Sequence, residues 1–416
     1  MRNSRFWGVL VIFMLLLDIY FFQAIRTVSS SASDNSRIII FTVYWVISVT
    51  AIAFLILMPY LHFERQAKFV RTTIFSVFAS LFFAKIVGSL FFVADDLRRS
   101  LHWLGAELFS SKSTLADLQS AGTLSRSMLF SWMGLVAGGG LFGSLVYGFN
   151  NKYRYDVKRI RLSFDNLPNA FKGFKVVHIS DIHSGSLTNK EAVMKGVEKI
   201  LEEKPDLILF TGDLVNNVAD EMNGYMDVFD KLKAPMGVYS TLGNHDYGDY
   251  VNWDSKELKA ANLDRLKQIH AELGWRLLMN EHVVLEKDDD KIALLGIENW
   301  SAKARFPKYG DLRRAYKGVA GHPFKILLSH DPSHWKAEVI TDYPDIDLML
   351  AGHTHGIQFG VEIPGLKWSP VQYVYKEWAG LYKKDKQKLY VNRGFGFLGY
   401  PGRVGILPEI SVIELV

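Results

Sequence analysis

The stretch Val176–His183, VVHISDIH, joins a buried-strand pattern to metal-binding side chains, because its apolar run ends abruptly in Asp181-x-His183. Four further clusters of Asp, Asn and His follow strand-like apolar runs. They are Gly212-Asp213, Gly243-Asn244-His245-Asp246, His330 and Gly352-His353-x-His355. A turn residue or a buried core histidine would explain any one cluster alone. Five clusters in this order, each at a strand end, indicate a site for two metal ions.

The residue types in these clusters suit phosphoester hydrolysis. Two metals ~3.5–4 Å apart provide a strong nucleophile and neutralise the phosphoryl oxygens, and they need about seven protein ligands. Carboxylate, imidazole and amide ligands suit Mn²⁺, Fe, Zn²⁺ or Co²⁺. The candidate ligands are Asp181, His183, Asp213, Asn244, His330, His353 and His355. A glycine directly precedes three of them, where it allows a sharp turn and a close backbone approach.

Taken together, these motifs resemble the calcineurin-like metallophosphoesterase superfamily. The contexts Asp181-Ile-His183-Ser-Gly185, Arg393-Gly394 and Pro408-Glu409-Ile410 are similar to its bacterial membrane-associated branch. The resemblance covers roughly residue 156 to the C-terminus. It implies two divalent metal ions and a hydroxide between them that attacks phosphorus in line. It assigns one metal to Asp181, His183 and His355, the other to Asn244, His330 and His353, and the bridging position to Asp213.

The resemblance also implies roles beside the metals. His245 would contact the phosphate and assist the leaving oxygen, and Asp246 would orient His245. The family often has an acid three residues after the Gly-Asp carboxylate, and this chain has Asn216 there. That difference concerns a supporting contact and not the metal ligands. We interpret His178, Asp331 and His334, which lie near the motifs, as supporting or structural residues.

Composition and charge indicate a membrane protein of two domains. The chain has 416 residues, 49% of them hydrophobic, and a formal charge of +5. Many basic residues flank apolar segments, where they would meet lipid headgroups, so we expect no nucleic-acid partner. Cysteine is absent, which excludes thiolate ligands and disulfides. We expect a transmembrane domain over residues 1–151 and a catalytic domain over residues 152–416.

Four apolar segments have the length that a helix needs to cross a bilayer, about 20 residues each. They cover approximately residues 6–25, 38–60, 69–93 and 128–149. Four spans place both ends of this region on one side. That side would hold Arg2, Arg5, Arg65, Lys68, Arg71, Lys152, Arg154, Lys158 and Arg159, and the other Arg26, Arg37, Arg98, Arg99, Lys112 and Arg126. This bias predicts a cytoplasmic catalytic domain. The resemblance to a bacterial membrane-associated branch implies a bacterial inner membrane.

Three features inside the membrane half carry predictions. Asp18 and Lys85 lie at similar depths in parallel spans, which predicts a buried ion pair; separate contacts with water are the alternative. Five glycines of the fourth span allow close helix packing, within the bundle or in a homodimer. Leu97, Leu101, Leu104 and Leu108 are spaced as in an amphipathic helix, either on the membrane surface or packed on the bundle.

In the second half, short apolar runs alternate with amphipathic helical stretches. This alternation predicts an α/β sandwich of two sheets with helices outside them. The predicted strands are Val176–Ile179, Asp206–Phe210, Gly237–Thr241, Val283–Leu285, Ile292–Ile297, Phe324–Leu328, Ile346–Leu350, Lys388–Asn392 and Glu409–Leu415. The predicted helices are Lys190–Glu203, Met222–Leu232 and Leu258–Leu273.

Two C-terminal features bear on the substrate. Arg393 and Arg403 would either grip a phosphate or form structural ion pairs. Residues 361–382, which include Trp368 and Trp378, combine aromatic residues with lysines, as at a membrane interface. They would form a mouth that takes substrate from the bilayer, or a packed loop.

The favoured function is therefore hydrolysis of a lipid or lipid-linked phosphodiester or pyrophosphate. The alternatives are a phosphodiesterase for soluble nucleotides and a catalytically silent membrane sensor or scaffold.

Overall fold

The computed structural model describes residues 4–57, 68–109 and 126–416. Its chain divides into two compact units, Met1–Tyr147 and Gly148–Val416.

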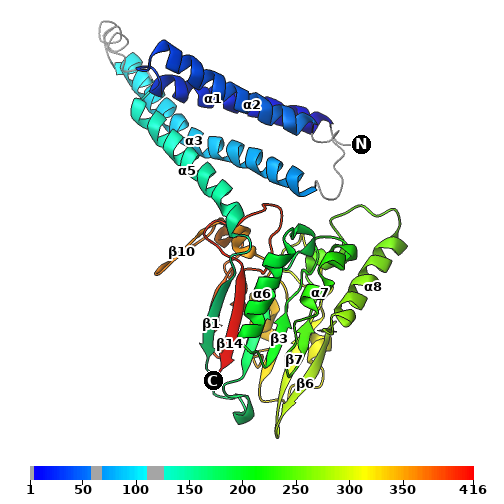
Figure 1. Ribbon diagram of the computed structural model, residues 1–416. Helices are drawn as coiled ribbons and strands as arrows, with labels where there is room; N and C mark the ends of the chain where they lie inside the picture. The colour runs from blue at the N-terminus through cyan, green and yellow to red at the C-terminus, as the bar shows by residue number, and fades with distance from the viewer. Residues whose placement is uncertain (1–3, 58–67, 110–125) are drawn as a thin grey trace. The chain divides into compact units, whose positions relative to one another are not determined.

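Over its described residues, the first unit contains four long apolar helices (Figure 1). They are α1 (Ser4–Val28), α2 (Asp34–Leu57), α3 (Lys68–Phe109) and α5 (Met128–Gly148). Each is long and apolar enough to cross a membrane, over 8–28, 34–57, 70–105 and 128–151. The prediction of four spans is confirmed. Residues 58–60 of the predicted second span, with Arg2, Arg65 and Lys112, lie outside the described residues.

The third helix is longer than the sequence suggested. We predicted a span that ends at Val93 and a separate amphipathic helix over the leucines that follow, but α3 continues through both as one helix of 42 residues. Between Val93 and Leu97 there is no glycine or proline to end a helix. Asp95 and Asp96 instead pair with Arg98 and Arg99 one turn later, which supports a continuous helix.

The predicted ion pair between Asp18 and Lys85 is present. The Lys85 ammonium contacts the Asp18 carboxylate directly, and both side chains are almost fully buried. Ser48 joins them, since its hydroxyl lies 3.0 Å from Asp18 Oδ1 and 2.8 Å from Lys85 Nζ. Tyr44 donates to the Asp18 backbone carbonyl at 2.8 Å. α1, α2 and α3 are therefore connected by one buried polar cluster.

Some glycines of α5 pack against α3. A Cβ on Gly134 or Gly138 would meet the α3 backbone at Gly88 or Ala84, so these glycines permit a close helix contact. Gly139, Gly140 and Gly143 have no described neighbour of this kind within 4 Å. Packing within the bundle accounts for the first two, and the homodimer stays a prediction.

The second unit contains two six-stranded sheets. The first has the order β1-β14-β2-β3-β4-β5 and the second β12-β13-β9-β8-β7-β6. Strands β2, β3, β4 and β5 are parallel, as are β7, β8, β9 and β13. The strands of the first sheet are β1 (Asp156–Leu162), β2 (Lys175–Ile179), β3 (Leu207–Phe210), β4 (Val238–Ser240), β5 (Arg276–Leu277) and β14 (Glu409–Leu415). Those of the second are β6 (Glu281–Lys287), β7 (Asp290–Gly296), β8 (Lys325–Leu328), β9 (Leu348–Ala351), β12 (Gly380–Lys384) and β13 (Gln387–Val391).

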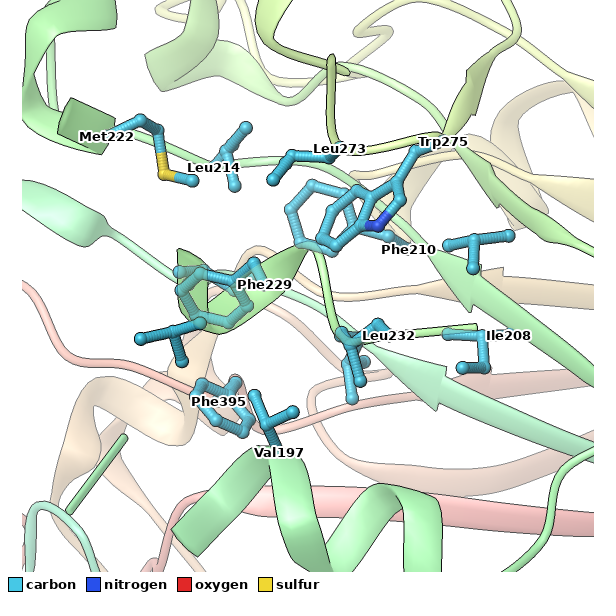
Figure 2. Packing of buried hydrophobic residues seen from close by; sticks show 14 of the residues in the cluster. Val197, Ile208, Phe210, Leu214, Met222, Phe229, Leu232, Leu273, Trp275 and Phe395 are labelled. Atoms are coloured by element: carbon cyan, nitrogen blue, oxygen red, sulfur yellow. The ribbon is translucent and has the colours of Figure 1, made fainter. Parts of the chain in front are cut away.

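Alternate residues of each strand enter different hydrophobic cores. In β3, Leu207 and Leu209 join the core between the two sheets, whereas Ile208 and Phe210 join a core on the outer face of the first sheet. This alternation follows from the two-residue period of a strand. The outer core is closed by α6 (Lys190–Glu202), α7 (Met226–Phe229) and α8 (Lys256–Glu272), and Figure 2 shows Val197 of α6 and Phe229 of α7 in it.

The second sheet is covered in the same way. In β9, Leu348 and Leu350 face the central core, and Met349 joins a third core with Leu312 of α9 (Leu312–Tyr316). A short α10 (Ile340–Asp342) follows, and a separate hairpin is formed by β10 (Val361–Ile363) and β11 (Leu366–Trp368). The predicted fold class, a helical membrane bundle followed by an α/β sandwich, is confirmed.

Candidate metal centre

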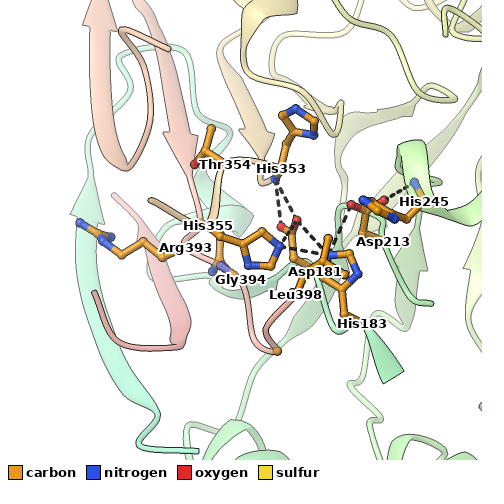
Figure 3. Close-up of polar contacts among 12 residues, drawn as sticks. Asp181, His183, Asp213, His245, His353, Thr354, His355, Arg393, Gly394 and Leu398 are labelled. Carbon is orange, nitrogen blue, oxygen red and sulfur yellow. Dashed lines mark hydrogen bonds and ion pairs between the residues drawn. The ribbon is translucent and has the colours of Figure 1, made fainter. Parts of the chain in front are cut away.

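Five strands deliver the predicted ligands to one place. β2, β3 and β4 of the first sheet and β8 and β9 of the second each end just before a candidate ligand. Because these strands are parallel within each sheet, their carboxyl ends lie at one edge, where active sites of α/β folds form. Figure 3 shows Asp181, His183, Asp213, His353 and His355 converging there.

One candidate metal group consists of Asp181, His183 and His355, whose ligand atoms lie within 4.8 Å of one another. The Nε2 atoms of the two histidines face each other at 3.0 Å, and His355 Nε2 lies 3.2 Å from Asp181 Oδ1. The Asp181 carboxylate is fixed because it accepts the His353 backbone N–H at 3.0–3.1 Å.

The second candidate group consists of Asp213, His330 and His353. His330 Nε2 lies 3.1 Å from Asp213 Oδ2 and 3.3 Å from His353 Nδ1. The other nitrogen of His330 is held by the Thr211 carbonyl at 2.7 Å, which leaves Nε2 for a ligand. Asp213 Oδ2 also lies 3.6 Å from His183 Nε2 of the first group, so Asp213 stands between the two groups.

Asn244, which lines the same cavity as Asp213 and His353, has a buried side-chain oxygen without a partner in the described part of the chain. Asn244 donates its amide N–H to the Tyr250 hydroxyl at 2.9 Å, but its Oδ1 is buried and accepts no hydrogen bond from the described residues. A buried, unpaired polar atom is costly unless something binds it. An amide oxygen beside carboxylates and imidazoles is a donor set that fits a divalent metal.

The ligands are held in a backbone conformation that is uncommon for their residue types. Asp181, His183, Asp213, His353 and His355 all have φ between +49° and +73°. Left-handed conformations of residues other than glycine cost about 1–3 kcal/mol each and cluster at functional sites. The strain indicates that this turn geometry is maintained for the position of the side chains.

Two glycines show why a side chain is excluded beside the ligands. A Cβ on Gly352 would collide with Ser180 Oγ and the Asp181 carboxylate. A Cβ on Gly243 would collide with the Asp213 carboxylate and the His330 ring. The glycines therefore allow the close approach that the sequence predicted.

Asp213 and the histidines around it shift each other's pKa values. Burial would lower the pKa of His330, but the Asp213 carboxylate outweighs it and raises that pKa to about 10. Burial would conversely raise the pKa of Asp213, but His330 and His245 hold it well below its usual range. For His183, burial prevails and lowers its pKa to about 3. The buried carboxylates thus attract positive charge, which a metal ion supplies.

His245 is oriented by a residue other than the expected one. Its Nδ1–H donates to the Asn216 carbonyl at 2.7 Å, and not to Asp246. The Asp246 carboxylate accepts four backbone N–H groups at 2.8–3.3 Å, those of Asp213, Leu214, Val215 and Gly243. The expectation that Asp246 orients the imidazole was wrong. Asp246 instead ties together the two turns that carry Asp213 and Asn244.

The two arginines expected as possible phosphate ligands are occupied elsewhere. Arg393 is buried against Glu409 and also donates to Glu362 at 2.7 Å, and it points away from the cluster (Figure 3). Arg403 is fully buried and donates to backbone carbonyls, including that of Arg393 at 2.7 Å. Neither is among the residues that line the cavity beside the metal groups. Arg393 forms the structural ion pairs that were the alternative.

That cavity, of about 300 Å³, contains residues that the motifs did not indicate. Arg305 lines it, with its guanidinium 4.6 Å from the centroid of the Phe306 ring. Tyr375 lines it too; its hydroxyl lies 2.9 Å from His353 Nε2 and donates to Asp331 at 3.0 Å. Both residues come from loops between elements, where the sequence shows no ligand pattern. Asp331 thus holds Tyr375, which contacts the candidate ligand His353. This agrees with the interpretation of Asp331 as a supporting residue.

The aromatic and lysine-rich stretch at residues 361–382 is only partly exposed. Trp378 is buried, and Lys367 Nζ lies 5.2 Å from the centroid of its ring. Val374 lines the cavity and is 49% exposed. Apolar residues of the β10–β11 hairpin, including Ile363 and Leu366, are more than half exposed. The exposed surface of this stretch is thus formed by aliphatic residues together with Tyr373, which is 73% exposed, and not by the buried Trp378.

Comparison with known proteins agrees with this geometry. The model for the calcineurin-like phosphoesterase family matches residues 174–356, and that for a "Probable Calcineurin-like phosphoesterase, transmembrane domain" matches residues 3–152. The uncharacterized metallophosphoesterase YkuE of Bacillus subtilis is 32% identical over 298 residues, which cover 70% of this chain and 96% of YkuE. The chain belongs to the calcineurin-like phosphoesterase family.

Two other relatives show the range of the family. The "Transmembrane protein with metallophosphoesterase domain" of Danio rerio is 29% identical, over 65% of this chain and 60% of its own length. The phosphodiesterase YaeI of Escherichia coli is 29% identical, over 63% of this chain and 88% of its own length. This chain is accordingly a metallophosphoesterase, a hydrolase of phosphoester bonds, and a membrane protein.

Proposed function

We propose that the chain hydrolyses a phosphodiester or pyrophosphate bond with two divalent cations. When bound, such ions supply a strong nucleophile and neutralise the phosphoryl oxygens. The convergence of seven ligand-type side chains from five strand ends supports this proposal above all. Asp181, His183 and His355 would hold one ion, and Asn244, His330 and His353 would hold the other. Asp213 would serve both sites, because its carboxylate lies between a histidine of each group.

His245 acts on the leaving group. Donation from Nδ1–H to the Asn216 carbonyl fixes the ring and its tautomer, so that Nε2 remains for the cavity that His245 lines. From there Nε2 contacts a phosphoryl oxygen and, when protonated, gives its proton to the departing oxygen. Asp246 contributes indirectly, by holding the turns of two ligands.

Arg305 binds the non-reacting phosphate oxygens. Its side chain is exposed at the cavity, and among the described residues it forms no ion pair. A guanidinium offers two parallel N–H donors to a phosphate, which orients the ester as well as attracting it.

The substrate is a lipid or a lipid-linked phosphoester. Ile357 and Val374 line the cavity and are about half exposed, 52% and 49% respectively. The β10–β11 hairpin, which lies between these two residues in the sequence, adds further exposed apolar side chains, and exposed apolar surface of this kind marks a lipid or protein contact. The exposed Lys376 beside it suits an anionic headgroup. From the charge bias of the spans, we place the chain in a bacterial inner membrane with its catalytic unit in the cytoplasm.

A paired-substrate assay tests the lipid proposal. Purified full-length protein is loaded with Mn²⁺ and given a phospholipid diester in mixed micelles or soluble bis-p-nitrophenyl phosphate. The double variant Ile363→Gln/Leu366→Gln is expected to lose about tenfold in kcat/KM on the lipid, since it replaces two exposed apolar contacts. Its kcat/KM on the soluble diester is expected to change less than about twofold, because surface substitutions away from the reacting groups have small effects.

Leu258→Gln is the matched control, because Leu258 is 52% exposed on α8, apart from the cavity lining. Equal losses of the hairpin variant on both substrates would contradict the lipid proposal and favour a soluble nucleotide diester. Absence of turnover on every substrate with metal bound would favour the silent sensor.

A further inference from the structure

The membrane bundle contains an arginine-rich cavity that the phosphoesterase chemistry does not use. It has a volume of about 580 Å³ and lies where α1 ends and α2 begins, beside α3 and the start of α5. Four of its eight lining residues are arginines. The lining residues are Gln23, Arg26, Thr27, Ser30, Arg37, Phe41, Arg99 and Arg126.

Nearby carboxylates do not balance these arginines. Asp34 pairs with Arg37, and Asp96 pairs with both Arg99 and Arg126. Asp95 is already shared between Arg99 and Arg98, the second of which lies outside the cavity lining. Arg26 pairs with no carboxylate of the described residues and has only a long contact, 3.4 Å, with the Gln23 side-chain oxygen. Among the described residues, therefore, the four arginines of the lining exceed the three carboxylates that pair with them.

The guanidinium of Arg126 is fixed by its neighbours and has a hydrogen-bond donor that the described residues leave unused. Its Nη2 lies 3.2 Å from Asp96 Oδ1, and its guanidinium carbon lies 5.1 Å from the Tyr20 ring centroid and 5.5 Å from that of Phe92. These contacts fix the plane of the group. Its Nη1 is buried and donates no hydrogen bond to any described residue. A fixed guanidinium with an unused donor is suited to a two-oxygen anion such as phosphate.

The cavity adjoins the exposed apolar surface of a candidate membrane-spanning helix. Arg37 occupies the first turn of α2, and the next residues, Ile38 and Ile39, are each 63% exposed on a membrane-spanning helix. Phe41, one turn further along α2, closes the cavity with an apolar surface. Polar headgroups meet apolar chains at such a boundary.

We propose that this cavity binds a phosphate-bearing group, that of a lipid headgroup or of a free phosphate compound, separately from the catalytic centre. Arg126 grips the phosphate oxygens, and Arg26 and Arg37 neutralise its charge from the open side. The lipid source is favoured by the apolar residues directly beside the arginines.

Ligand-induced stabilisation tests this site in the intact chain. Metal-stripped full-length protein in an uncharged detergent is titrated with dioctanoyl phosphatidic acid, dioctanoyl phosphatidylcholine, inorganic phosphate and pyrophosphate, and its unfolding is followed by tryptophan fluorescence. Phosphatidic acid is expected to stabilise wild type. The Arg26→Gln/Arg126→Gln variant is expected to bind it about tenfold or more weakly, as for loss of charge-assisted hydrogen bonds. Arg98→Gln, at the same end of α3 but outside the lining, is expected to bind like wild type.

The single variant Arg26→Gln separates binding from folding, because Arg26 is exposed and its loss leaves the helices packed. It is expected to weaken binding about threefold or more, within the range for an exposed charged contact. Stabilisation by inorganic phosphate or pyrophosphate at equal concentration would assign the site to a soluble phosphate compound. No stabilisation by any phosphate probe, or an equal loss in Arg98→Gln, would overturn the proposal.

Discussion

Replacement of Asp246 by asparagine distinguishes two roles for this residue. In the structure the Asp246 carboxylate accepts two backbone N–H groups on each oxygen, at 2.8 and 3.3 Å on Oδ1 and at 2.8 and 2.9 Å on Oδ2. An asparagine has only one carbonyl oxygen, so its amide group would face two N–H donors in either orientation. Two buried N–H groups would then lose their acceptor.

The expected cost follows from this count. Each buried donor left without a partner costs about 1–3 kcal/mol, which gives roughly 2–6 kcal/mol for Asp246→Asn. For a unit of this size, the midpoint of thermal unfolding would fall by on the order of 10 °C. The same N–H groups belong to the turns that carry Asp213 and Asn244, so bound metal is expected to fall too.

Two measurements on full-length protein test this reasoning: thermal unfolding, and metal content by inductively coupled plasma mass spectrometry. His245→Ala is expected to lose activity about 10²–10⁴-fold while it keeps its metal and its stability, as for loss of an acid–base group. Asp254→Asn, an exposed carboxylate, is the matched control. If Asp246→Asn kept wild-type stability and metal content but lost activity as His245→Ala does, Asp246 would act on His245, and the structural argument would be refuted.

Four further predictions address other parts of the molecule. Arg305→Gln is expected to lower kcat/KM for diesters about tenfold or more at unchanged unfolding temperature, as for a lost charge-assisted hydrogen bond. Arg393→Gln is expected to affect stability instead: its unfolding temperature should fall because the buried Glu409 loses its partner. In the bundle, Asp18→Asn or Lys85→Met alone is expected to cost about 3–5 kcal/mol, whereas the double variant recovers much of that loss, measured as a double-mutant cycle of unfolding in detergent. Chelation of bound metal is expected to lower the unfolding temperature of the catalytic unit and Mn²⁺ to restore it, in a fluorescence melt; no shift would contradict the assigned ligands.

The sequence predicted those parts of the site that follow from local pattern. A strand has a period of two residues and a fixed direction, so the apolar runs before Asp181, Asp213 and His353 indicated both the sheets and the edge where the ligands meet. The side-chain pair of Asp18 and Lys85 was predictable for a similar reason, since the rise of a helix gives the depth of each residue in its span.

Residues placed by long loops could not be predicted in this way. Arg305 and Tyr375 reach the cavity from segments whose path depends on packing with distant elements, and nothing in their neighbours repeats with a strand or helix period. For Arg393 and Arg403, the local sequence pattern suggested phosphate binding, but the structure shows them in internal contacts. A glycine-rich context suggests an exposed phosphate loop, but here the glycines let the backbone approach buried arginines that hold the loop from within.

In both halves of the chain, charges that are not balanced within the described residues indicate a bound ion of opposite charge. In the catalytic unit, the buried carboxylates of Asp181 and Asp213 lie among histidines and beside an unpaired amide oxygen, an arrangement that only a cation completes. In the bundle, Asp18 and Lys85 pair with each other, whereas among the described residues the arginines that line the cavity outnumber the carboxylates that pair with them, an arrangement that suits a bound anion. A chain that leaves opposite charges unbalanced at two separate places is adapted to bind metal at one and phosphate at the other. The two sites are therefore testable separately. A metal ion should stabilise only the catalytic unit, and a phosphate-bearing ligand should stabilise only the bundle.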